Sequence, residues 1–439
     1  MVSSVFTKYR LFFVCFLALM ASGFEADSQS LAAKKRIYGI VIKGGHVIDP
    51  KNNINEVMDI ATEIAPPSIK GQPVAEPKIA LIAKNIDTAL ALQVVNAKGM
   101  YVSPGLIDIH THVFYGHSKS DYLSNGSIAV IPDSYTFRTG VTTVVDAGGA
   151  GWKSFQTFKK NIIDISATRV LSMLNIVGEG MRGGEYEQNI GDMDSEKTAA
   201  AALENKEHVV GFKLAHFGKA DWTPVERLTK AGRIADMPVM VDFGSGNQSL
   251  EELFFKYLRP GDIYTHSFCY VPGVREPIID TETKIVKPFI RKAQEIGLVF
   301  DIGFGSGSFD YRTAIPAMKQ GFYPNTLGTD LHASSINGAM KDQMNVFSVF
   351  LAMGMDIPSI IKAATWTPAI TIKRPELGNL SKGAIADIAV ISMREGDFGF
   401  KDIVGNRQEG KRRFECQLTI KGGRVVYDLN AISSKPHLQ

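Results

Sequence analysis

The sequence predicts an α/β protein, in which a TIM (β/α)8 barrel is joined to a small β-sandwich domain formed from both chain ends. Eight short apolar runs recur along the middle of the chain, and helix-like stretches separate them. β-like segments with similar glycine turns stand near the two ends. The 439 residues suffice for a barrel of roughly 250 residues and a smaller partner domain.

Residues 1–28 have the layout of a secretory signal peptide. Lys8 and Arg10 form a short positive region, an apolar run follows over residues 11–20, and residues 26–28 (ADS) offer a small-x-small cleavage site. The apolar run is shorter than the ~20 residues that span a bilayer. A retained membrane anchor is the alternative. We expect an exported protein, periplasmic or secreted, with no stable membrane span after cleavage of the signal.

β-like segments open and close the rest of the chain. Residues 36–42 lead into one Gly-Gly pair and residues 424–428 follow another, within the similar stretches IKGGHVID and IKGGRVVYD. We therefore expect residues 29–103 and 373–430 to build one small β domain, with residues 431–439 as a tail. Further strands are expected at residues 78–83, 93–96, 387–392 and 416–420.

Eight apolar runs predict the strands of a barrel over residues 104–372. They are rich in Val, Ile and Leu without strict polar alternation, as strands buried on both faces should be. Their last residues fall 24 to 39 positions apart, which fits a βα repeat of about 30 residues. A doubly wound open sheet is the competing fold, but polar residues end nearly every run. The runs cover residues 105–112, 142–148, 169–177, 209–216, 238–244, 262–268, 298–305 and 325–332, with helix-like stretches such as 249–257, 287–294 and 343–353 between them.

Polar side chains gather at the C-terminal ends of these runs, which form the active-site face of a TIM barrel. His110 and His112 end the first run and, being two positions apart on a strand, face the same side. Two imidazoles so placed can share one ion, and histidine is a preferred zinc ligand. An isolated H-x-H pair is weak evidence, whereas this pair follows a predicted first strand. Later strand ends present Lys213, Asp242, His266 and Asp330.

Lys213 stands between apolar residues on a buried run. A bare buried ammonium is costly, so it needs a partner or loses its proton. A lysine paired with Asp330 or Asp242 in a metal-free site is the alternative to metal chemistry. His266 alone could be a core histidine, and Asp330 alone could cap a turn. Their positions beside the other polar strand ends favour metal binding.

Several motifs together resemble the amidohydrolase superfamily. They are PGLIDIHTH at residues 104–112, the lysine of the fourth run, THSF at 265–268, GTDLH at 328–332 and the late stretch TWTPA…LGNLSKGAIADIAVI. Within the superfamily the chain resembles the amidohydrolase/deacetylase metallohydrolases, often labelled dihydroorotase-like, over nearly all of residues 36–428. The order of these residue types along the strands is specific, although any one motif is not.

The resemblance implies two divalent metal ions, zinc first and manganese as the alternative, and a role for each strand-end residue. His110 and His112 would hold the first, buried ion, and His266 would hold the second. Lys213 would be carboxylated on its amine and bridge both ions, which turns a misplaced cation into a ligand. Asp330 would bind the first ion and act as general base and acid on a metal-bridging hydroxide.

Asp242 departs from this pattern, because many relatives have a histidine at the end of strand five. Aspartate is also a zinc ligand. Three outcomes stay open: Asp242 ligates the second ion, the second site is weak or empty, or Asp242 only supports the ligands. If it ligates, we expect a more anionic site, with a stronger base and weaker Lewis acids.

The loops after the strands are expected to supply substrate contacts. Arg182, in the glycine-rich segment 179–186, could clamp a substrate carboxylate, although a solvated surface arginine is the alternative. His332 could touch the substrate or support the ligands.

The predicted function is a binuclear metal-dependent hydrolase of an amide (carbon–nitrogen) or ester bond, which deacylates a small N-acyl or O-acyl carboxylic acid. A cyclic-amide hydrolase of the dihydroorotase or hydantoinase kind would share the metal chemistry, and a mononuclear deaminase usually lacks the bridging lysine. A catalytically silent binding protein on the same fold is the alternative of another class. The formal net charge of +3 gives no basic stripe, so we expect a small-molecule substrate and no nucleic acid. A homo-oligomer is compatible with the sequence.

Overall fold

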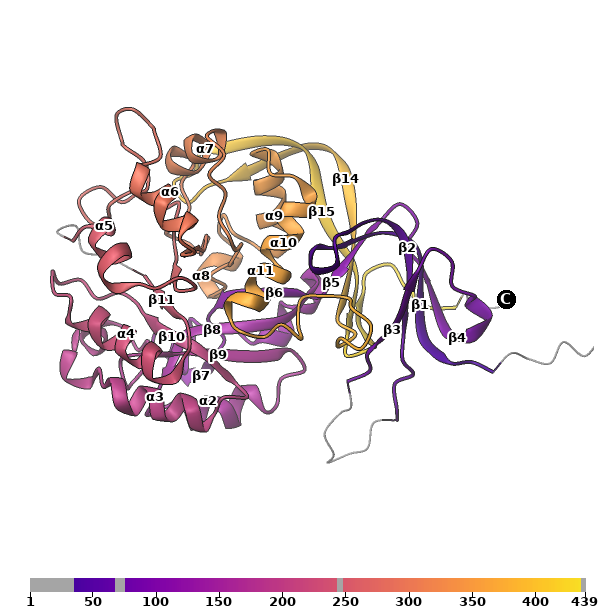
Figure 1. Cartoon of the computed structure of the whole chain (residues 1–439), viewed down its shortest axis with the longest axis horizontal. Helices are drawn as coiled ribbons and strands as arrows, with labels where there is room; N and C mark the ends of the chain where they lie inside the picture. Colours follow the sequence, from indigo (N-terminus) through magenta and orange to yellow (C-terminus); the bar gives the residue numbers. More distant parts are fainter. Residues whose placement is uncertain (1–34, 68–75, 243–247, 436–439) are drawn as a thin grey trace, which may run out of the picture. The chain divides into compact units, whose positions relative to one another are not determined.

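Two β-sheets, one of them surrounded by helices, organise the chain (Figure 1). The computed structural model describes residues 35–67, 76–242 and 248–435. The predicted signal peptide, the last two residues of the predicted fifth barrel run and the last four residues of the predicted tail lie outside these ranges. Both sheets belong to one compact unit, Ile37–Gln439.

The wall of the barrel is a parallel sheet that has seven strands within the described residues. The eighth predicted run forms isolated parallel bridges in place of a regular strand: Thr326 pairs with Asp301, and Leu331 pairs with Thr111. These bridges join the two edges of the sheet, so the chain closes into the predicted barrel. In sheet order the strands are β13 (Val299–Phe300), β12 (Ile263–Tyr264), β11 (Val239–Val241), β10 (Val209–Leu214), β9 (Arg169–Asn175), β8 (Val141–Gly151) and β6 (Leu106–Thr111).

Helices follow most of the strands and cover the outside of the barrel (Figure 1). Side chains of aspartate or serine cap the N-termini of several of them, for example Asp194 on α3 and Asp342 on α9. The predicted helical stretches 287–294 and 343–353 correspond to α6 and α9, and 249–257 contains α5 followed by a π-helical turn. The helices are α2 (Phe155–Phe158), α3 (Ser195–Glu204), α4 (Thr223–Ala235), α5 (Leu250–Glu252), α6 (Pro288–Glu295), α7 (Tyr311–Lys319), α8 (Ala333–Ile336), α9 (Gln343–Ala352), α10 (Ile357–Ala363) and α11 (Trp366–Thr371).

Two apolar cores hold the barrel together. One fills its interior with side chains such as Ile107, Met173 and Ile263, together with Ile372 and Leu377 from the chain after α11. The other lies between the strands and the surrounding helices and is rich in phenylalanine. Because apolar side chains fill the interior, the polar groups of the strand ends are confined to one mouth of the barrel.

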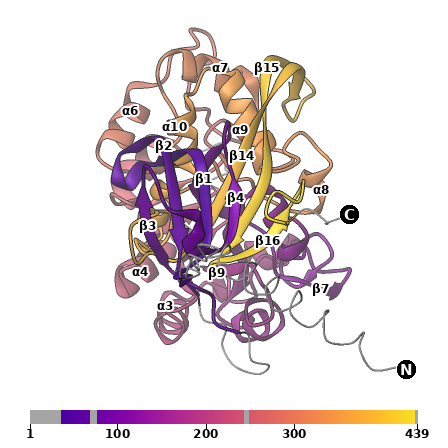
Figure 2. The same cartoon turned by 90° about the vertical axis from the view of Figure 1, so that its right-hand side faces the viewer.

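The second sheet takes strands from both ends of the chain, as predicted, and Figure 2 shows them side by side. Along one edge β1 pairs with both β4 and β5, and β14 pairs with β5, which joins the two chain ends. The enclosed core likewise combines residues from both ends, for example Val47 and Val102 with Ile388 and Leu418. The strands are β1 (Tyr38–Asp49), β2 (Ile54–Thr62), β3 (Ile79–Ala83), β4 (Ala91–Asn96), β5 (Tyr101–Pro104), β14 (Ile388–Lys401), β15 (Arg407–Lys421) and β16 (Arg424–Asp428); the short β7 (Tyr115–Ser118) lies outside this sheet.

The second sheet also differs from the sequence expectation. Strand β2 was not expected, and β14 and β15 extend well beyond the predicted 387–392 and 416–420. The extension forms a long antiparallel hairpin whose β15 arm packs on α9, where Phe414 contacts Phe347 with ring centroids 5.7 Å apart. Its exposed residues are mostly charged, so hydropathy alone does not indicate a strand there.

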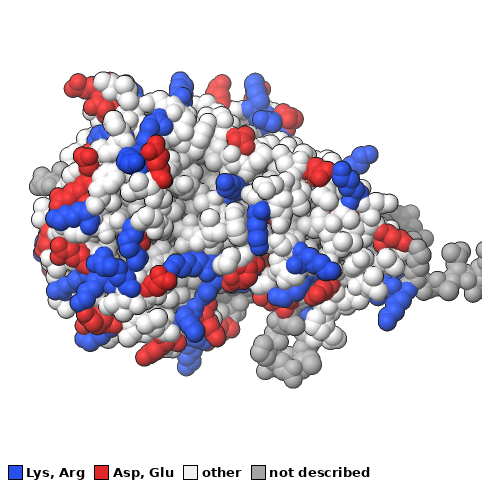
Figure 3. Space-filling model, in the orientation of Figure 1, with Lys and Arg blue, Asp and Glu red and all other residues white. Residues whose placement is uncertain are grey.

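Acidic and basic side chains are interspersed on the face shown in Figure 3. Across the described residues, no helix combines the length and the apolar character that crossing a membrane requires.

Candidate metal centre

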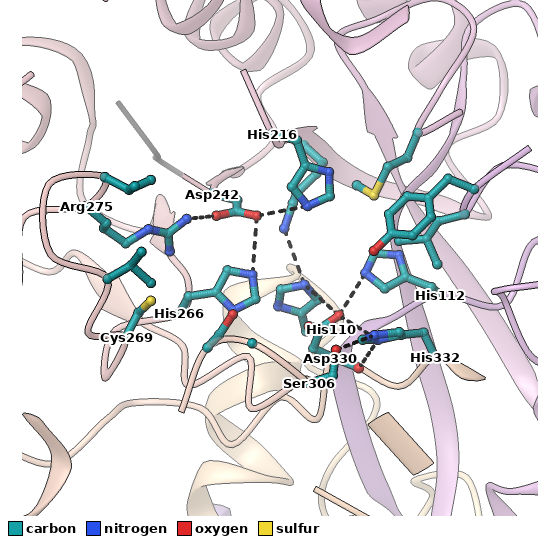
Figure 4. A pocket seen from close by; sticks show the side chains of 18 residues that line it. His110, His112, His216, Asp242, His266, Cys269, Arg275, Ser306, Asp330 and His332 are labelled. Carbon is teal, nitrogen blue, oxygen red and sulfur yellow. Dashed lines mark hydrogen bonds and ion pairs between the residues drawn. The ribbon is translucent and has the colours of Figure 1, made fainter. Parts of the chain in front are cut away.

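A cavity of about 240 Å³ lies at the C-terminal ends of the barrel strands. The six side chains predicted to hold metal all line it, although they come from five different strand ends (Figure 4). Three of the residues that leave the strands here have a left-handed backbone: His216, His266 and Asp330, with φ of 56°, 57° and 52°. Non-glycine residues seldom adopt this conformation, and it is often concentrated at functional sites. The six side chains are His110, His112, Lys213, Asp242, His266 and Asp330.

His110, His112 and Asp330 form the tightest group in the cavity. One ligand atom from each lies within 4.8 Å of the others, and all three residues are buried. Asp330 Oδ1 is 3.0 Å from His112 Nε2 and 3.8 Å from His110 Nε2. Two imidazole nitrogens and a carboxylate oxygen converging in this way match the donor types that zinc prefers.

Asp301, which the sequence reasoning did not identify, holds His110 from behind. The His110 Nδ1–H donates to Asp301 Oδ2 at 3.1 Å and to Thr265 Oγ1 at 2.8 Å. Because Nδ1 carries the proton, Nε2 presents its lone pair to the cavity. Burial, together with the charge of Lys213, lowers the pKa of His110 to about 4, so the imidazole is neutral at pH 7. Asp301 could have been found as the one charged residue in the run 298–305.

Lys213 lines the cavity and is 1% exposed. Its Nζ is 3.3 Å from His110 Nε2 and 3.4 Å from Met240 Sδ. Within the part of the chain that the structure describes, no ion pair joins Lys213 to a carboxylate within 4.0 Å, so the direct pairing of the metal-free alternative is not formed. Burial lowers the pKa of Lys213, although the charges of Asp242 and Asp330 oppose this effect.

Asp242 and His266 form a second group. The His266 Nδ1–H donates to the Gly303 carbonyl at 2.7 Å, which leaves the lone pair of Nε2 facing Asp242 Oδ2 at 3.3 Å. Two acceptors at this distance repel each other unless a proton or a cation lies between them. The Asp242–His266 pair therefore fits a divalent ion. The buried Lys213 amine, which has no acid partner among the described residues, fits the carboxylated form that would serve as a metal ligand.

Arg275, a second residue that the sequence reasoning missed, forms an ion pair with Asp242 Oδ1. Burial by itself would raise the pKa of Asp242, but the charge of Arg275 opposes burial, and the pKa lies well below its usual range. The guanidinium thus supplies a positive charge that offsets the carboxylate of Asp242. The expected surplus of negative charge is therefore balanced within the protein. Nothing in the loop sequence around Arg275 marks it for this position.

The two predicted substrate contacts lie in different places. His332 lines the cavity; its Nδ1–H donates to the backbone carbonyl of Asp330 at 2.7 Å, and its Nε2 is 3.2 Å from Ser306 Oγ. Arg182 lines a separate, more open pocket that shares Tyr122 and His216 with the cavity. There the guanidinium pairs with Asp121 and Glu179 at 3.0 and 3.3 Å and lies over the ring of Tyr186.

A parallel barrel with histidines and carboxylates converging at its strand ends defines the class: a hydrolase barrel built for divalent metals. The model of the amidohydrolase family matches residues 283–426. A deacetylase of Agrobacterium fabrum is 31% identical over 357 residues, which are 80% of this chain and 84% of that protein. A deacetylase of Brucella anthropi is 30% identical over 356 residues, 79% of this chain and 85% of that one.

Two solved structures share the fold of this chain. A crystal structure of an adenine deaminase is 27% identical with a TM-score of 0.78, covering 89% of this chain and 100% of that chain. A dihydroorotase is also 27% identical, with a TM-score of 0.75 and coverage of 89% and 99%. This chain belongs to the amidohydrolase family and is a hydrolase of carbon–nitrogen bonds other than peptide bonds. Enzymes of this family generally use divalent metals and act on small molecules.

Proposed function

We propose that this chain is a metal-dependent deacetylase that removes the acyl group from a small N-acyl or O-acyl carboxylic acid. The observation that carries the proposal is the convergence of six metal-type side chains on one cavity of about 240 Å³. The names of the relatives support the reaction: three deacetylases are 28–31% identical to this chain over 79–82% of its length.

Two divalent ions, zinc first and manganese second, fit the donor set. His110, His112 and Asp330 would hold the first ion. Asp242 and His266 would hold the second, with a carboxylated Lys213 bridging both, which accounts for a buried lysine without an acid partner. When bound, such a pair lowers the pKa of water toward neutrality and polarises a carbonyl group.

Asp330 is proposed to take the proton of the attacking water at its carboxylate and to pass it to the leaving nitrogen or oxygen. Burial by itself would raise the pKa of Asp330, but hydrogen bonds from His112 and His332 hold it well below its usual range. The carboxylate is therefore ionised and able to accept a proton. The Asp330 backbone carbonyl also accepts a hydrogen bond from the Ser335 hydroxyl at 3.0 Å, which fixes the turn carrying the side chain.

The remaining lining of the cavity is mixed, which suits a small amphiphilic substrate. Leu123, Met181, Val271 and Val274 supply apolar surface for an acyl group or an aliphatic side chain. His332 is proposed to contact the substrate directly. Arg182, which pairs with Asp121 and Glu179, is proposed to contact only a part of the substrate that extends into the outer pocket.

A cyclic-amide hydrolase is the second candidate, because the dihydroorotase structure covers 89% of this chain with a TM-score of 0.75. Sequence relatives named dihydroorotase support this candidate less: one from a Sulfurihydrogenibium species matches 98 residues, 22% of this chain. The deacetylase reading therefore has the broader support.

Turnover of a substrate panel by the zinc- or manganese-loaded enzyme tests the proposal. The panel contains N-acetyl amino acids, O-acetyl hydroxy acids, hydantoin and dihydroorotate, with the Asp330→Asn variant as a control for contaminating activity. We expect acetate release from acylated carboxylic acids by the wild type alone. Turnover restricted to the cyclic amides would replace deacetylation with the second candidate, and no turnover of either group would refute both.

Export is part of the proposal, with residues 1–28 as a cleaved signal peptide. Expression of the full chain in a bacterium should place the protein outside the cytoplasm, and N-terminal sequencing should begin near residue 29. An intact N-terminus on a cytoplasmic protein would contradict export and leave the hydrolase assignment untouched.

A further inference from the structure

Arg275 is a buried arginine whose hydrogen-bonding capacity is only partly used. Its side chain is 12% exposed and lines the cavity from the loop that follows β12. Nη2 forms the ion pair with Asp242, while Nη1 is buried and has no hydrogen-bond partner among the described residues. An unsatisfied buried donor on a charged group costs free energy, and such groups in native proteins normally have a partner.

We propose that Arg275 binds the carboxylate of the substrate and so selects acylated acids over their neutral analogues. This inference rests on the proposed deacetylase function. A guanidinium presents five N–H donors in a planar fork that suits a carboxylate. Nη2 of the fork already holds Asp242, and Nη1 is a buried donor without a partner among the described residues, which a carboxylate bound at this wall of the cavity would satisfy.

The competing cations are less suited to this task. Lys213 is the other long-chain basic residue among the described residues that line the cavity; it is proposed to be carboxylated, and its Nζ is enclosed by His110 and Met240. Arg182 lies in the outer pocket with two acidic partners. A substrate carboxylate inside the cavity therefore meets Arg275 first.

The position of Arg275 also restricts where the substrate carboxylate can stand. Arg275 contacts one oxygen of Asp242, and the other oxygen is 3.3 Å from His266 Nε2, so anchor and metal ligands are separated by a single carboxylate group. A substrate that is held by Arg275 and by the metal centre at once needs its carboxylate only a few bonds from the scissile carbonyl. Val271 and Val274, from the same loop, line the cavity beside the anchor. The substrate class is an α-acylamino or α-acyloxy acid with an apolar side chain.

The test compares one substrate pair across matched variants. N-acetylleucine, as each enantiomer, carries the carboxylate, and N-acetylleucinamide replaces it with a neutral amide of similar shape. Arg275→Met removes the charge and Arg275→Lys keeps it. Arg312→Met is the control, because Arg312 also pairs with a buried aspartate, Asp310, yet its side chain is 48% exposed and does not line the cavity.

In Arg275→Met we expect kcat/KM for N-acetylleucine to fall about 100-fold, because hydrogen bonds to a charged group contribute free energy of this order. The loss should appear mainly in KM, Arg275→Lys should recover part of it, and the amide should change less than about threefold. Metal content, measured in parallel, should stay at the wild-type value, and Arg312→Met should behave as wild type. Equal losses on acid and amide, or a loss of metal that accompanies them, would show that Arg275 acts through Asp242 and would overturn the inference.

A binding measurement separates this inference from the proposed reaction. Calorimetry with the metal-loaded protein uses 4-methylpentanoate and 4-methylpentanamide, which lack the N-acetyl group that the proposed reaction removes. We expect the Kd of the acid to rise about 100-fold in Arg275→Met and that of the amide to stay constant. If no acylated substrate is turned over but the acid binds in this way, the deacetylase proposal fails and the anchor stands. If substrates are turned over and the wild type binds acid and amide equally, the anchor fails alone.

Discussion

Replacing Asp301 with asparagine should weaken metal binding at the first site without removing a ligand. Asp301 is fully buried and accepts four hydrogen bonds, two on each oxygen. Oδ2 accepts from the His110 Nδ1–H and the Thr265 hydroxyl, and Oδ1 accepts from the Thr326 hydroxyl and the Gly328 N–H. Asparagine keeps the shape of this group but offers one acceptor oxygen in place of two.

The size of the effect follows from where the new amide nitrogen points. Facing His110, it meets an N–H donor, and His110 must move its proton to Nε2 and lose the lone pair that faces the cavity. Facing Gly328, it leaves a backbone N–H unsatisfied, which costs about 1–3 kcal/mol of folding free energy. Groups that orient metal-binding histidines are typically worth 10- to 100-fold in metal affinity. We therefore expect a zinc Kd raised roughly 10- to 100-fold for Asp301→Asn.

Competition between the apo-protein and a chromogenic zinc chelator measures this Kd. The matched control is Asp262→Asn at the opposite end of the barrel, where Asp262 is equally buried and accepts hydrogen bonds from the Val239 and Arg259 backbone N–H groups. This control should lose stability and keep its zinc affinity. Should both variants bind zinc as tightly as the wild type, Asp301 does not orient His110 for a metal.

Three further outcomes follow from the same structure. Asp330→Asn should lower kcat by about 10²- to 10⁴-fold, the range for losing a general acid–base group; acetate-release kinetics measure it, and near wild-type turnover would refute the proton-transfer role. Lys213→Met should bind one metal ion fewer per chain, because the bridging ligand is lost; elemental analysis checks this, and unchanged metal content would exclude bridging. Arg169→Gln should lower the free energy of unfolding by about 1.5–3 kcal/mol, because Arg169 on β9 joins the barrel to the end-built sheet through Asp387 and Glu76 at 2.5 and 2.6 Å; urea denaturation measures it, and an unchanged midpoint would mean that the contact carries no net stability.

The barrel and the metal-type residues could be predicted because their signals are local. Each barrel strand is a short apolar run, and five of the eight runs carry the metal-type residues at or near their ends. His110, Lys213 and Asp330 are more than 100 positions from one another in the sequence. They can still be expected to lie close together, because the C-terminal ends of the barrel strands share one face. The second sheet could be predicted because the two ends of the chain carry similar β-like segments with glycine turns.

The groups that tune the centre could not be predicted in the same way. Arg275 reaches Asp242 from a loop, and loop paths depend on tertiary packing that no periodicity reveals. The expectation of a more anionic site followed from reading Asp242 without its partner. Asp301 was overlooked because a charged residue inside an apolar run was read as part of a strand. The hairpin of β14 and β15 extends over charged residues whose pattern does not indicate burial.

Metal analysis of the purified wild-type protein, after loading with zinc and removal of unbound ions, tests the central claim most directly. The arrangement of His110, His112, Lys213, His266 and Asp330 predicts close to two zinc ions per chain. A chain that retains no zinc, with its fold intact by circular dichroism, would contradict the account.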